Sequence, residues 1–379
     1  MTKRPAGDAR AATQGPDWDW YRLALLEADQ AAARGHAIDD RCFALLRDLG
    51  VFRTLLPREL GGAEHEPLAA MALIEDLAAL SGTLGWVSFV GVVGGMFAAE
   101  LTPEAAREIY ADPDALVAYA GAPAGALTRL DGAYRLTGRW EPVSGLSHAT
   151  WVAVGCRIAD EPGRPAVGIV PRHAGTVQFG WEPVGLSGTG TGALALNEVA
   201  LPARRMLRGG TGRDRRSTRY RPLVPSLMAS VSLGLGRAVL QETAAWLAAE
   251  PPGTDGRRRA DSAQIQELLG RAYAEVRAAR AFLLEVTAET WQRVCQGEEL
   301  GLEHGALHRL AATHAATVAA EASSTVAALA GTRAVTRSHA QCRRWLDART
   351  VTANITVHSL YYQVYGGVAA GGAIPESWP

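Results

Sequence analysis

Hydrophobic residues recur at helical spacing over the first hundred positions of the chain. The stretches 32–49 and 68–80 each place apolar side chains on one helical face. The sequence Thr-Pro-Glu at 102–104 begins another helix, because a hydroxyl cap, a proline at the first helical position and an acid in the first turn all favour a helix start. The pattern predicts an N-terminal helical domain over 17–111.

The stretch 77–99 contains no charged residue and is bounded by Asp76 and Glu100. A membrane-spanning helix needs about 20 mostly apolar residues. Here serine, threonine and several glycines interrupt the apolar run, and basic flanking residues are missing. We therefore interpret 77–99 as a buried helix of a soluble protein and expect no membrane association.

The period of the pattern changes near residue 112. Apolar and polar residues alternate over 127–136 around Asp131-Gly132, which is a strong signal for a β-hairpin. Four further short strands are predicted at 149–158, 166–170, 177–181 and 193–199. The sequence thus predicts an all-β middle domain over 112–203.

Helical spacing returns after an arginine-rich linker at 204–221. Long alanine-rich helices are predicted at 223–249, 261–296, 302–330 and 336–358. Their lengths and short connections favour an antiparallel four-helix bundle over 222–379. At the other end of the chain, residues 1–16 are polar with no apolar core, and we expect a disordered tail.

The composition narrows the class of protein only a little. A net charge of −1 argues against a dedicated nucleic-acid binder. The four cysteines lack the spacing of a zinc site or a disulfide framework. His304 and His308 are one helical turn apart, but without a Glu-x-x-His framework we expect a solvated helix face and no metal. The glycine-rich run 188–192 lacks the lysine of a nucleotide-triphosphate loop.

Several separated motifs occur in a recognisable order. They are LRDLGVFRTLLPRELGG at 46–62, DGAYRLTGRWEPVSGLSHATW at 131–151, WEPVGLSGTGTGALALNEVALPARR at 181–205, and QCRRWLD at 341–347 followed by His358. Together they resemble the acyl-CoA dehydrogenase superfamily, and within it the flavin-dependent monooxygenase branch. The resemblance covers about residues 20–370.

The resemblance implies an α+β, acyl-CoA dehydrogenase-like fold. It combines an N-terminal α-helical domain, a middle β-barrel domain and a C-terminal four-helix bundle in a homotetramer. Flavin is expected between the β domain and the bundle. Ser144 matches the family's hydroxyl at the reactive edge of the flavin, and His358 matches a flavin-facing histidine. A turn serine and an ordinary bundle histidine are the alternatives.

Further cofactor-binding residues follow from the same resemblance. Besides Ser144, they are Gly121, Ala122, Gly188, Thr189, Arg343 and Arg344. Small residues at 121–122 permit close approach of the backbone to the ring, although a plain turn has the same composition. The arginines at 343–344 match a region that holds flavin phosphate or a subunit contact, and an ion pair within the helix is the alternative.

Three departures from the family pattern bear on the chemistry. The turn that carries a glutamate base in many dehydrogenases is Tyr365-Gly366-Gly367 here, so simple dehydrogenation loses support. The N-terminal histidine of many monooxygenases is replaced by Gly94 or Gly95. The arginine that often follows Gly-Leu in the middle domain is Ser187.

The leading hypothesis is a cytoplasmic two-component monooxygenase. A separate reductase would supply reduced FMN or FAD, and this subunit would form a C4a-hydroperoxide with O₂ to hydroxylate or N-oxidise a small organic substrate. The alternatives are a flavin dehydrogenase or desaturase acting on an acyl thioester or related substrate, and a binding protein without flavin. The arginines of 204–221 leave open a phosphate, coenzyme A or carrier-protein contact, with a solvated linker as the simpler interpretation.

Overall fold

The computed structural model describes residues 17–32, 37–161, 165–208, 219–336 and 339–372. The predicted tail at 1–16 lies outside the described residues. Contacts divide the chain into two compact units. The first, which we call the sheet unit, comprises Met1–His65, Val90–Glu182 and Ser187–Thr218. The second, the bundle unit, comprises Glu66–Phe89, Pro183–Leu186 and Arg219–Pro379.

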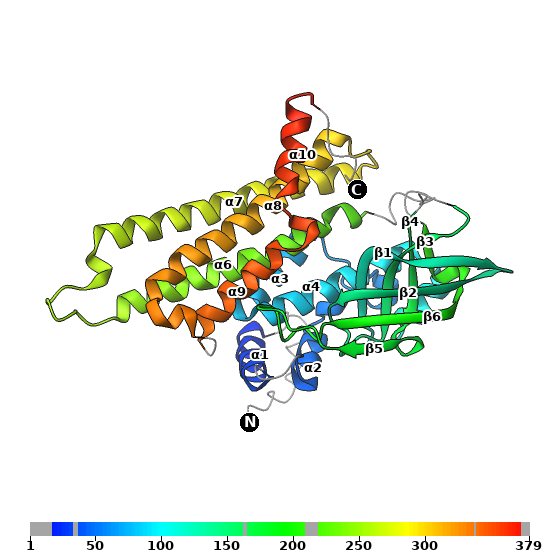
Figure 1. Ribbon diagram of the computed structural model, residues 1–379, viewed down its shortest axis with the longest axis horizontal. Coiled ribbons are helices and arrows are strands. Elements are labelled where there is room, and N and C mark those ends of the chain that lie inside the picture. The colour runs from blue at the N-terminus through cyan, green and yellow to red at the C-terminus, as the bar shows by residue number, and fades with distance from the viewer. Residues whose placement is uncertain (1–16, 33–36, 162–164, 209–218, 337–338, 373–379) are drawn as a thin grey trace. The chain divides into compact units, whose positions relative to one another are not determined.

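The sheet unit combines short helices with seven strands (Figure 1). Its helices are α1 (Trp18–Ala32), α2 (Asp40–Asp48), α5 (Pro103–Tyr110) and the second half of α4 (Gly82–Met96). Its strands are β1 (Val117–Leu130), β2 (Ala133–Val143), β3 (Trp151–Ile158), β4 (Pro165–Pro171), β5 (Thr176–Phe179), β6 (Gly192–Pro202) and β7 (Met206–Arg208). The predicted cap of α5 is confirmed, since the Thr102 side chain accepts a hydrogen bond from the Ala105 N–H.

The strands form one sheet in the order β5-β6-β2-β1-β3-β4-β7. The predicted hairpin at Asp131-Gly132 is confirmed, because Leu130 pairs with Ala133 across the turn. The predicted barrel is not closed: no pairing joins the two end strands within the described residues. Of these end strands, β5 has four residues and β7 has three. They offer too few backbone groups to close the sheet along its length.

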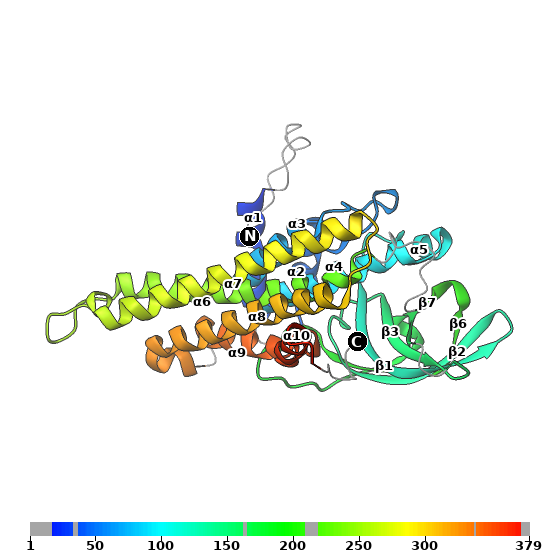
Figure 2. The same ribbon diagram turned by 90° about the horizontal axis from the view of Figure 1, so that it is seen from above.

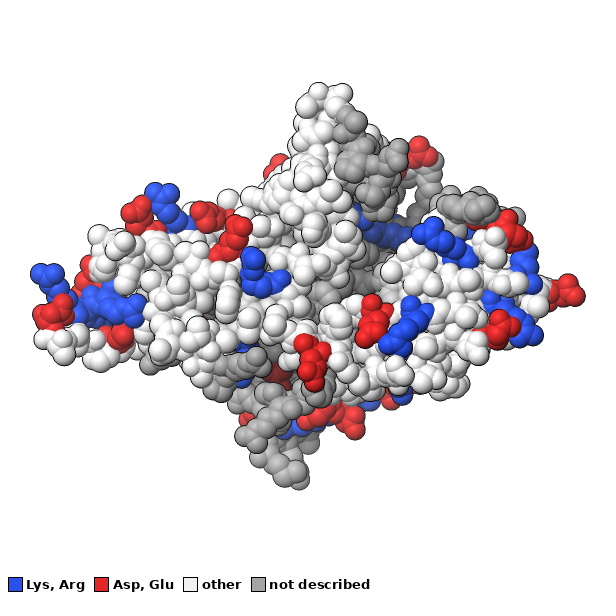
Figure 3. All heavy atoms as spheres, viewed as in Figure 1, with Lys and Arg blue, Asp and Glu red and all other residues white. Residues whose placement is uncertain are grey.

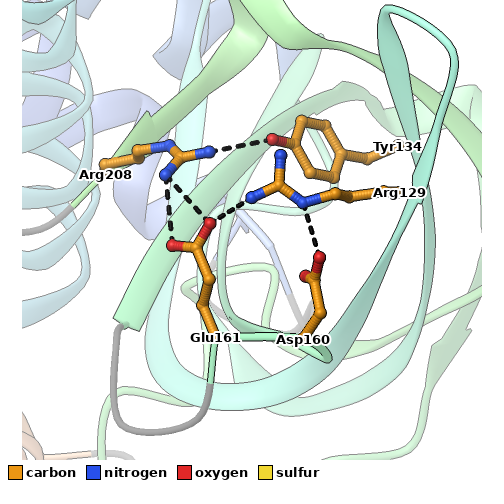
Figure 4. Close-up of polar contacts among 5 residues, drawn as sticks. All are labelled: Arg129, Tyr134, Asp160, Glu161 and Arg208. Carbon is orange, nitrogen blue, oxygen red and sulfur yellow. Dashed lines mark hydrogen bonds and ion pairs between the residues drawn. The ribbon is translucent and has the colours of Figure 1, made fainter.

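A cluster of ion pairs fixes β7 at one end of the sheet (Figure 4). Arg208 of β7 donates to both carboxylate oxygens of Glu161, at 3.2 and 3.1 Å, and to the Tyr134 hydroxyl at 3.0 Å. Arg129 of β1 also pairs with Glu161, and its Nε donates to Asp160 at 2.7 Å. Three strands and the turn after β3 are thereby joined by side chains as well as by the backbone.

Charged side chains of both signs lie next to each other over the sheet (Figure 3). Arg135 pairs with Glu198 and Arg139 with Glu141, all four half-exposed or exposed. This part of the face in Figure 3 therefore shows no field of a single sign, unlike the basic stripe of a nucleic-acid binder.

The bundle unit is built from helices, most of which run alongside one another, whereas the short last helix stands across them (Figures 1 and 2). They are α3 (Pro67–Leu80), the first half of α4, α6 (Val224–Ala249), α7 (Ala263–Cys295), α8 (Leu302–Ala327), α9 (Ala340–Thr352) and α10 (Leu360–Ala369). The first three predicted bundle helices are confirmed within a few residues. The fourth, predicted over 336–358, ends earlier and is followed by the short 3₁₀ turn Ile355–Val357. The Asn354 side chain accepts from the Thr356 N–H and starts that turn.

Helix α3 packs with the bundle helices rather than with α1 and α2. The sequence had grouped this helix with an N-terminal domain over 17–111. A grouping of residues by their contacts does not by itself define domain boundaries. The division into three domains therefore stays a prediction.

A buried carboxylate joins three helices of the bundle unit. Glu75 of α3 is 4% exposed. Its Oε2 and Oε1 accept from the Arg280 Nε of α7 at 2.8 and 3.2 Å. Arg237 of α6 approaches the same carboxylate at 3.5 Å and pairs with Asp76 at 2.6 Å. A carboxylate excluded from water is stable only when it is paired in this way.

A chain of hydroxyl groups and one imidazole lies in the bundle core. The Ser226 Oγ is 2.7 Å from the His308 Nε2 and 2.8 Å from the Thr287 Oγ1. Thr287 donates its proton to the Leu283 carbonyl, so Ser226 donates to Thr287 and the neutral His308 ring donates to Ser226. The predicted solvated face is therefore wrong for His308, which is 3% exposed.

Two helical stretches, Gly82–Glu100 and Arg221–Ala249, pass a length and hydropathy test for membrane spans. In each, 89% of the apolar window is buried inside the protein. Such burial is typical of core helices. The uncharged stretch 77–99 was predicted as one buried helix, and the structure divides it at Ser81 between the end of α3 and the start of α4.

We expect Glu75→Gln to lower the free energy of unfolding by about 2 to 3 kcal/mol, because a buried charge-assisted pair is broken. The neighbouring variant Asp76→Asn is the control, since its ion pair is half-exposed and contributes less than about 1 kcal/mol. Urea unfolding of both proteins measures the difference. Equal losses would mean that burial of Glu75 adds nothing.

The buried imidazole makes stability depend on pH. Burial, with smaller contributions from Arg309 and His304, lowers the pKa of His308 from 6.5 to about 3. The unfolded chain therefore binds a proton below about pH 6.5 that the folded protein refuses, and stability falls as the pH falls from there toward 3.

We expect His308→Gln to remove up to about 1.4 kcal/mol per pH unit from the slope of unfolding free energy between about pH 6 and about pH 4. Ser226→Ala, which leaves the imidazole buried, is expected to keep the slope while lowering stability at every pH. Urea unfolding across this pH range is the measurement. A slope unchanged in His308→Gln would contradict the assignment.

Candidate functional site

Strand pairing brings two of the predicted site segments together in the sheet unit. Ser144 directly follows β2, and Thr191 directly precedes β6. These strands are antiparallel partners, with Val143 opposite Gly192. The residue after one strand and the residue before the other therefore become neighbours at the same end of the sheet.

Three hydroxyl groups form a continuous chain at this end of the sheet. The Ser144 Oγ lies 2.9 Å from the Thr191 Oγ1, which lies 2.7 Å from the Thr189 Oγ1. Thr189 is 2% exposed, whereas Ser144 and Thr191 are partly exposed. The chain thus runs from the interior to the surface. Thr191 is a site residue that the sequence analysis did not single out, although alternate threonines in Gly-Thr-Gly-Thr-Gly are a usable signal.

The loop backbone holds this hydroxyl chain in place. The Gly145 N–H donates to the Thr189 carbonyl at 2.9 Å. Gly190 has a φ of +60°, and a Cβ there would stand 2.6 Å from the Ser147 Oγ. Only glycine fits this position, so the two threonines on either side keep their common direction. The predicted Gly188 lies in the same loop and is partly exposed.

The predicted residues Gly121 and Ala122 lie in an irregular part of β1. The pairing of β1 with β3 shifts register between Ala120 and Gly125. The four residues between them are exposed. A strand segment freed from its ladder in this way presents backbone groups that a ligand can use.

At Gly94, one of the two positions that match the family's N-terminal histidine, packing leaves no room for a side chain. A Cβ on Gly94 of α4 would stand 2.2 Å from the Val117 carbonyl oxygen of β1. A histidine therefore does not fit there without separating the helix from the strand. The nearby His148 is instead held on α2, with its ring stacked on Phe43 at 4.7 Å and its Nε2 at 3.4 Å from Asp40.

His358 lies in the bundle unit, between the 3₁₀ turn and α10 rather than late in a continuous helix as predicted. It is exposed, and its Nδ1 accepts a hydrogen bond from the Leu360 N–H at 3.2 Å. The neutral ring therefore carries its proton on Nε2. The residues Tyr365-Gly366-Gly367, which match the glutamate-bearing turn of many dehydrogenases, lie within α10 and form no turn.

The two predicted arginines of α9 have different surroundings. Arg343 is exposed. Arg344 is partly buried, pairs with Glu242 at 2.9 Å and donates to the Leu80 carbonyl at the end of α3 at 2.9 Å. One turn further, Asp347 accepts from the Leu186 N–H at 2.6 Å. Arg344 thus joins α9 to α3 and α6. Its ion pair is with another helix, whereas the alternative interpretation expected an ion pair within α9.

The sheet unit offers what a flat, polar heterocycle requires. Ser144 provides a hydroxyl that both donates and accepts, and the exposed segment 121–124 provides backbone groups with small side chains. The described residues contain no group of three or more His, Cys, Asp or Glu side chains placed to hold a metal ion. The hydroxyl of Ser144 and the small residues of 121–124 fit a planar organic cofactor such as flavin.

Comparisons with known proteins agree with this chemistry. The acyl-CoA dehydrogenase C-terminal domain family matches residues 226–359. An indole-3-acetate monooxygenase of Pseudomonas putida is 31% identical over 97% of this chain and 96% of its own length. A second indole-3-acetate monooxygenase, of Acinetobacter baumannii, is 28% identical over 86% of each chain.

Solved structures share the fold. The 3-HSA hydroxylase of Rhodococcus sp. RHA1 superposes with a TM-score of 0.85 at 22% identity, over 95% of this chain and 97% of the other. XiaF of Streptomyces sp., solved with FADH2 and glycerol, gives a TM-score of 0.86 at 22% identity over 95% of each chain. Helices and sheet thus have the arrangement of acyl-CoA dehydrogenase-like enzymes.

The fold and the match of residues 226–359 are those of acyl-CoA dehydrogenase-like proteins. Within that class, the chain belongs to the family of flavin-dependent monooxygenases that includes the indole-3-acetate monooxygenases. It is a flavin-dependent oxidoreductase that works with reduced flavin.

The cap at α10 allows the structural role of His358 to be separated from any chemical role. We expect His358→Ala to speed amide exchange at Leu360 about fivefold, because the cap acceptor is lost. In His358→Asn, the Oδ1 replaces the Nδ1 acceptor, and exchange is expected to stay near wild type. Hydrogen exchange measured by mass spectrometry on peptides of α10 tests this. Equal exchange in both variants would exclude the cap.

Proposed function

We propose that this protein is the oxygenase component of a two-component system, and that it inserts one oxygen atom of O₂ into a small aromatic substrate. A separate reductase would supply reduced FMN or FAD. The balance is one substrate C–H, one reduced flavin and one O₂ giving one hydroxylated product, oxidised flavin and water. The observation that carries the proposal is similarity over nearly the whole chain to a monooxygenase named for an aromatic acid.

The partner and the substrate class rest on the names of relatives. Two relatives are named as the oxygenase subunit or component of flavin-dependent hydroxylases, which supports a separate reductase. Indole-3-acetate and resorcinol, the compounds in the relatives' names, are both aromatic. N-oxidation of an amine, a homotetramer, a cytoplasmic location and a carrier-protein or coenzyme A partner are further proposals, which rest on the sequence and the family resemblance.

The site residues enter the proposal with separate roles. Bound reduced flavin supplies the electrons that activate O₂. We assign Ser144 to a hydrogen bond with the reactive edge of the flavin, with Gly121, Ala122, Gly188 and Thr189 lining its approach. We assign the Nε2–H of His358 as the hydrogen-bond donor toward the reacting oxygen, and Arg343, an exposed arginine of α9, as a phosphate contact.

The test is isotopic. The protein is supplied with reduced flavin, oxygen-18 gas and a panel of aromatic acids and phenols that includes indole-3-acetate. We expect one labelled oxygen in the product. A parallel anaerobic reaction with oxidised flavin and an acyl thioester tests for dehydrogenation. Conversion there, without label uptake in the first reaction, would replace the proposal with a dehydrogenase.

Variants then test the assigned roles in that assay. Ser144→Ala and His358→Asn are each expected to lower product formed per O₂ consumed about tenfold, with hydrogen peroxide making up the difference. His358→Asn is the informative variant because it keeps the α10 cap. Product yields at the wild-type level in both variants would contradict the assigned roles while leaving the reaction class untouched.

A further inference from the structure

The middle hydroxyl of the chain at the end of the sheet has one proton to donate and two neighbours to receive it. Thr191 lies 2.9 Å from the Ser144 Oγ and 2.7 Å from the Thr189 Oγ1. When Thr191 donates to Ser144, the Ser144 proton is free for a ligand. When Thr191 donates to Thr189, Ser144 donates to Thr191 and offers a ligand only its lone pairs.

We infer that Thr191 is a positioning residue that sets whether Ser144 acts as a hydrogen-bond donor or acceptor toward flavin. This inference rests on the proposed function of Ser144. The arrangement suits such a role, because Thr191 connects the buried Thr189 with the partly exposed Ser144. The direction of the bond between Thr191 and Ser144 therefore decides whether the Ser144 proton is available to a ligand.

Two backbone features hold the three hydroxyl groups within hydrogen-bond distance of each other. Gly190 permits the left-handed turn that places Thr189 and Thr191 within hydrogen-bond distance of each other. The pairing of Val143 with Gly192 fixes the distance between Ser144 and Thr191. The backbone therefore holds Thr191 between the other two hydroxyl groups.

The probe is flavin labelled with nitrogen-15 at N5, as FMN or FAD, whichever binds. Its N5 chemical shift reports the hydrogen bond at that atom without any turnover. We expect Thr191→Val to move the shift of bound flavin toward the value in Ser144→Ala, because the isosteric side chain removes only the hydroxyl. Thr191→Ser is expected to restore the wild-type shift. Thr176→Val, at an exposed position of β5, is the matched control and is expected to change nothing.

A double variant separates positioning from a general loss of structure. Thr191→Val alone is expected to lower product per O₂ about fivefold, as the loss of one hydrogen bond predicts. In the Ser144→Ala background, Thr191→Val is expected to have no further effect on either the shift or the yield. Additive losses, or a wild-type N5 shift in Thr191→Val, would overturn the inference.

The outcomes also distinguish this inference from the proposed function. If labelled flavin does not bind, or if Ser144→Ala leaves the N5 shift unchanged, the assignment of Ser144 itself fails and the inference about Thr191 falls with it. If Ser144→Ala moves the shift and Thr191→Val does not, only the inference fails.

Discussion

The antiparallel pairing of β2 with β6 is the contact on which the site depends. It places the residue that leaves one strand beside the residue that enters the other, with Val143 opposite Gly192. The serine and threonine that follow from this register come from segments 47 residues apart in the chain. A shift of one residue would turn every side chain of β6 to the opposite face and separate the hydroxyl groups. The register of β2 with β6 therefore determines which side chains meet at this end of the sheet.

The bundle unit solves a different packing problem. The buried positions of α8 are mostly alanine, so this helix offers little side-chain volume with which to fix its neighbours. Small side chains permit close helix contacts but specify their rotation weakly. Polar contacts supply that specificity: Glu75 links α3 to α6 and α7, and His308 links α8 to α6 through Ser226. Each of these polar contacts has a defined geometry, whereas contacts between alanine side chains allow helices to shift against each other.

Local features of the fold were predictable from the sequence, and long-range ones were not. The Asp131-Gly132 hairpin, the Thr102 cap and the first three bundle helices depend on neighbouring residues, and all three are confirmed. Closure of the sheet depends on the two end strands, one of which, β7, has only three residues and left no periodic signal. The burial of His308 depends on which helix faces it, and spacing from His304 carries no such information.

The sequence predicted individual site residues, but not the contacts that hold them in place. Ser144 and Thr189 were found through the family resemblance, whereas Thr191 between them emerged only from the distances. At Gly94, one of the two positions where the family pattern has a histidine, helix and strand meet where a side chain would stand. Hydroxyl groups reverse their polarity by rotation and do not ionise near neutral pH. This end of the sheet unit is thus suited to directing hydrogen bonds toward a ligand.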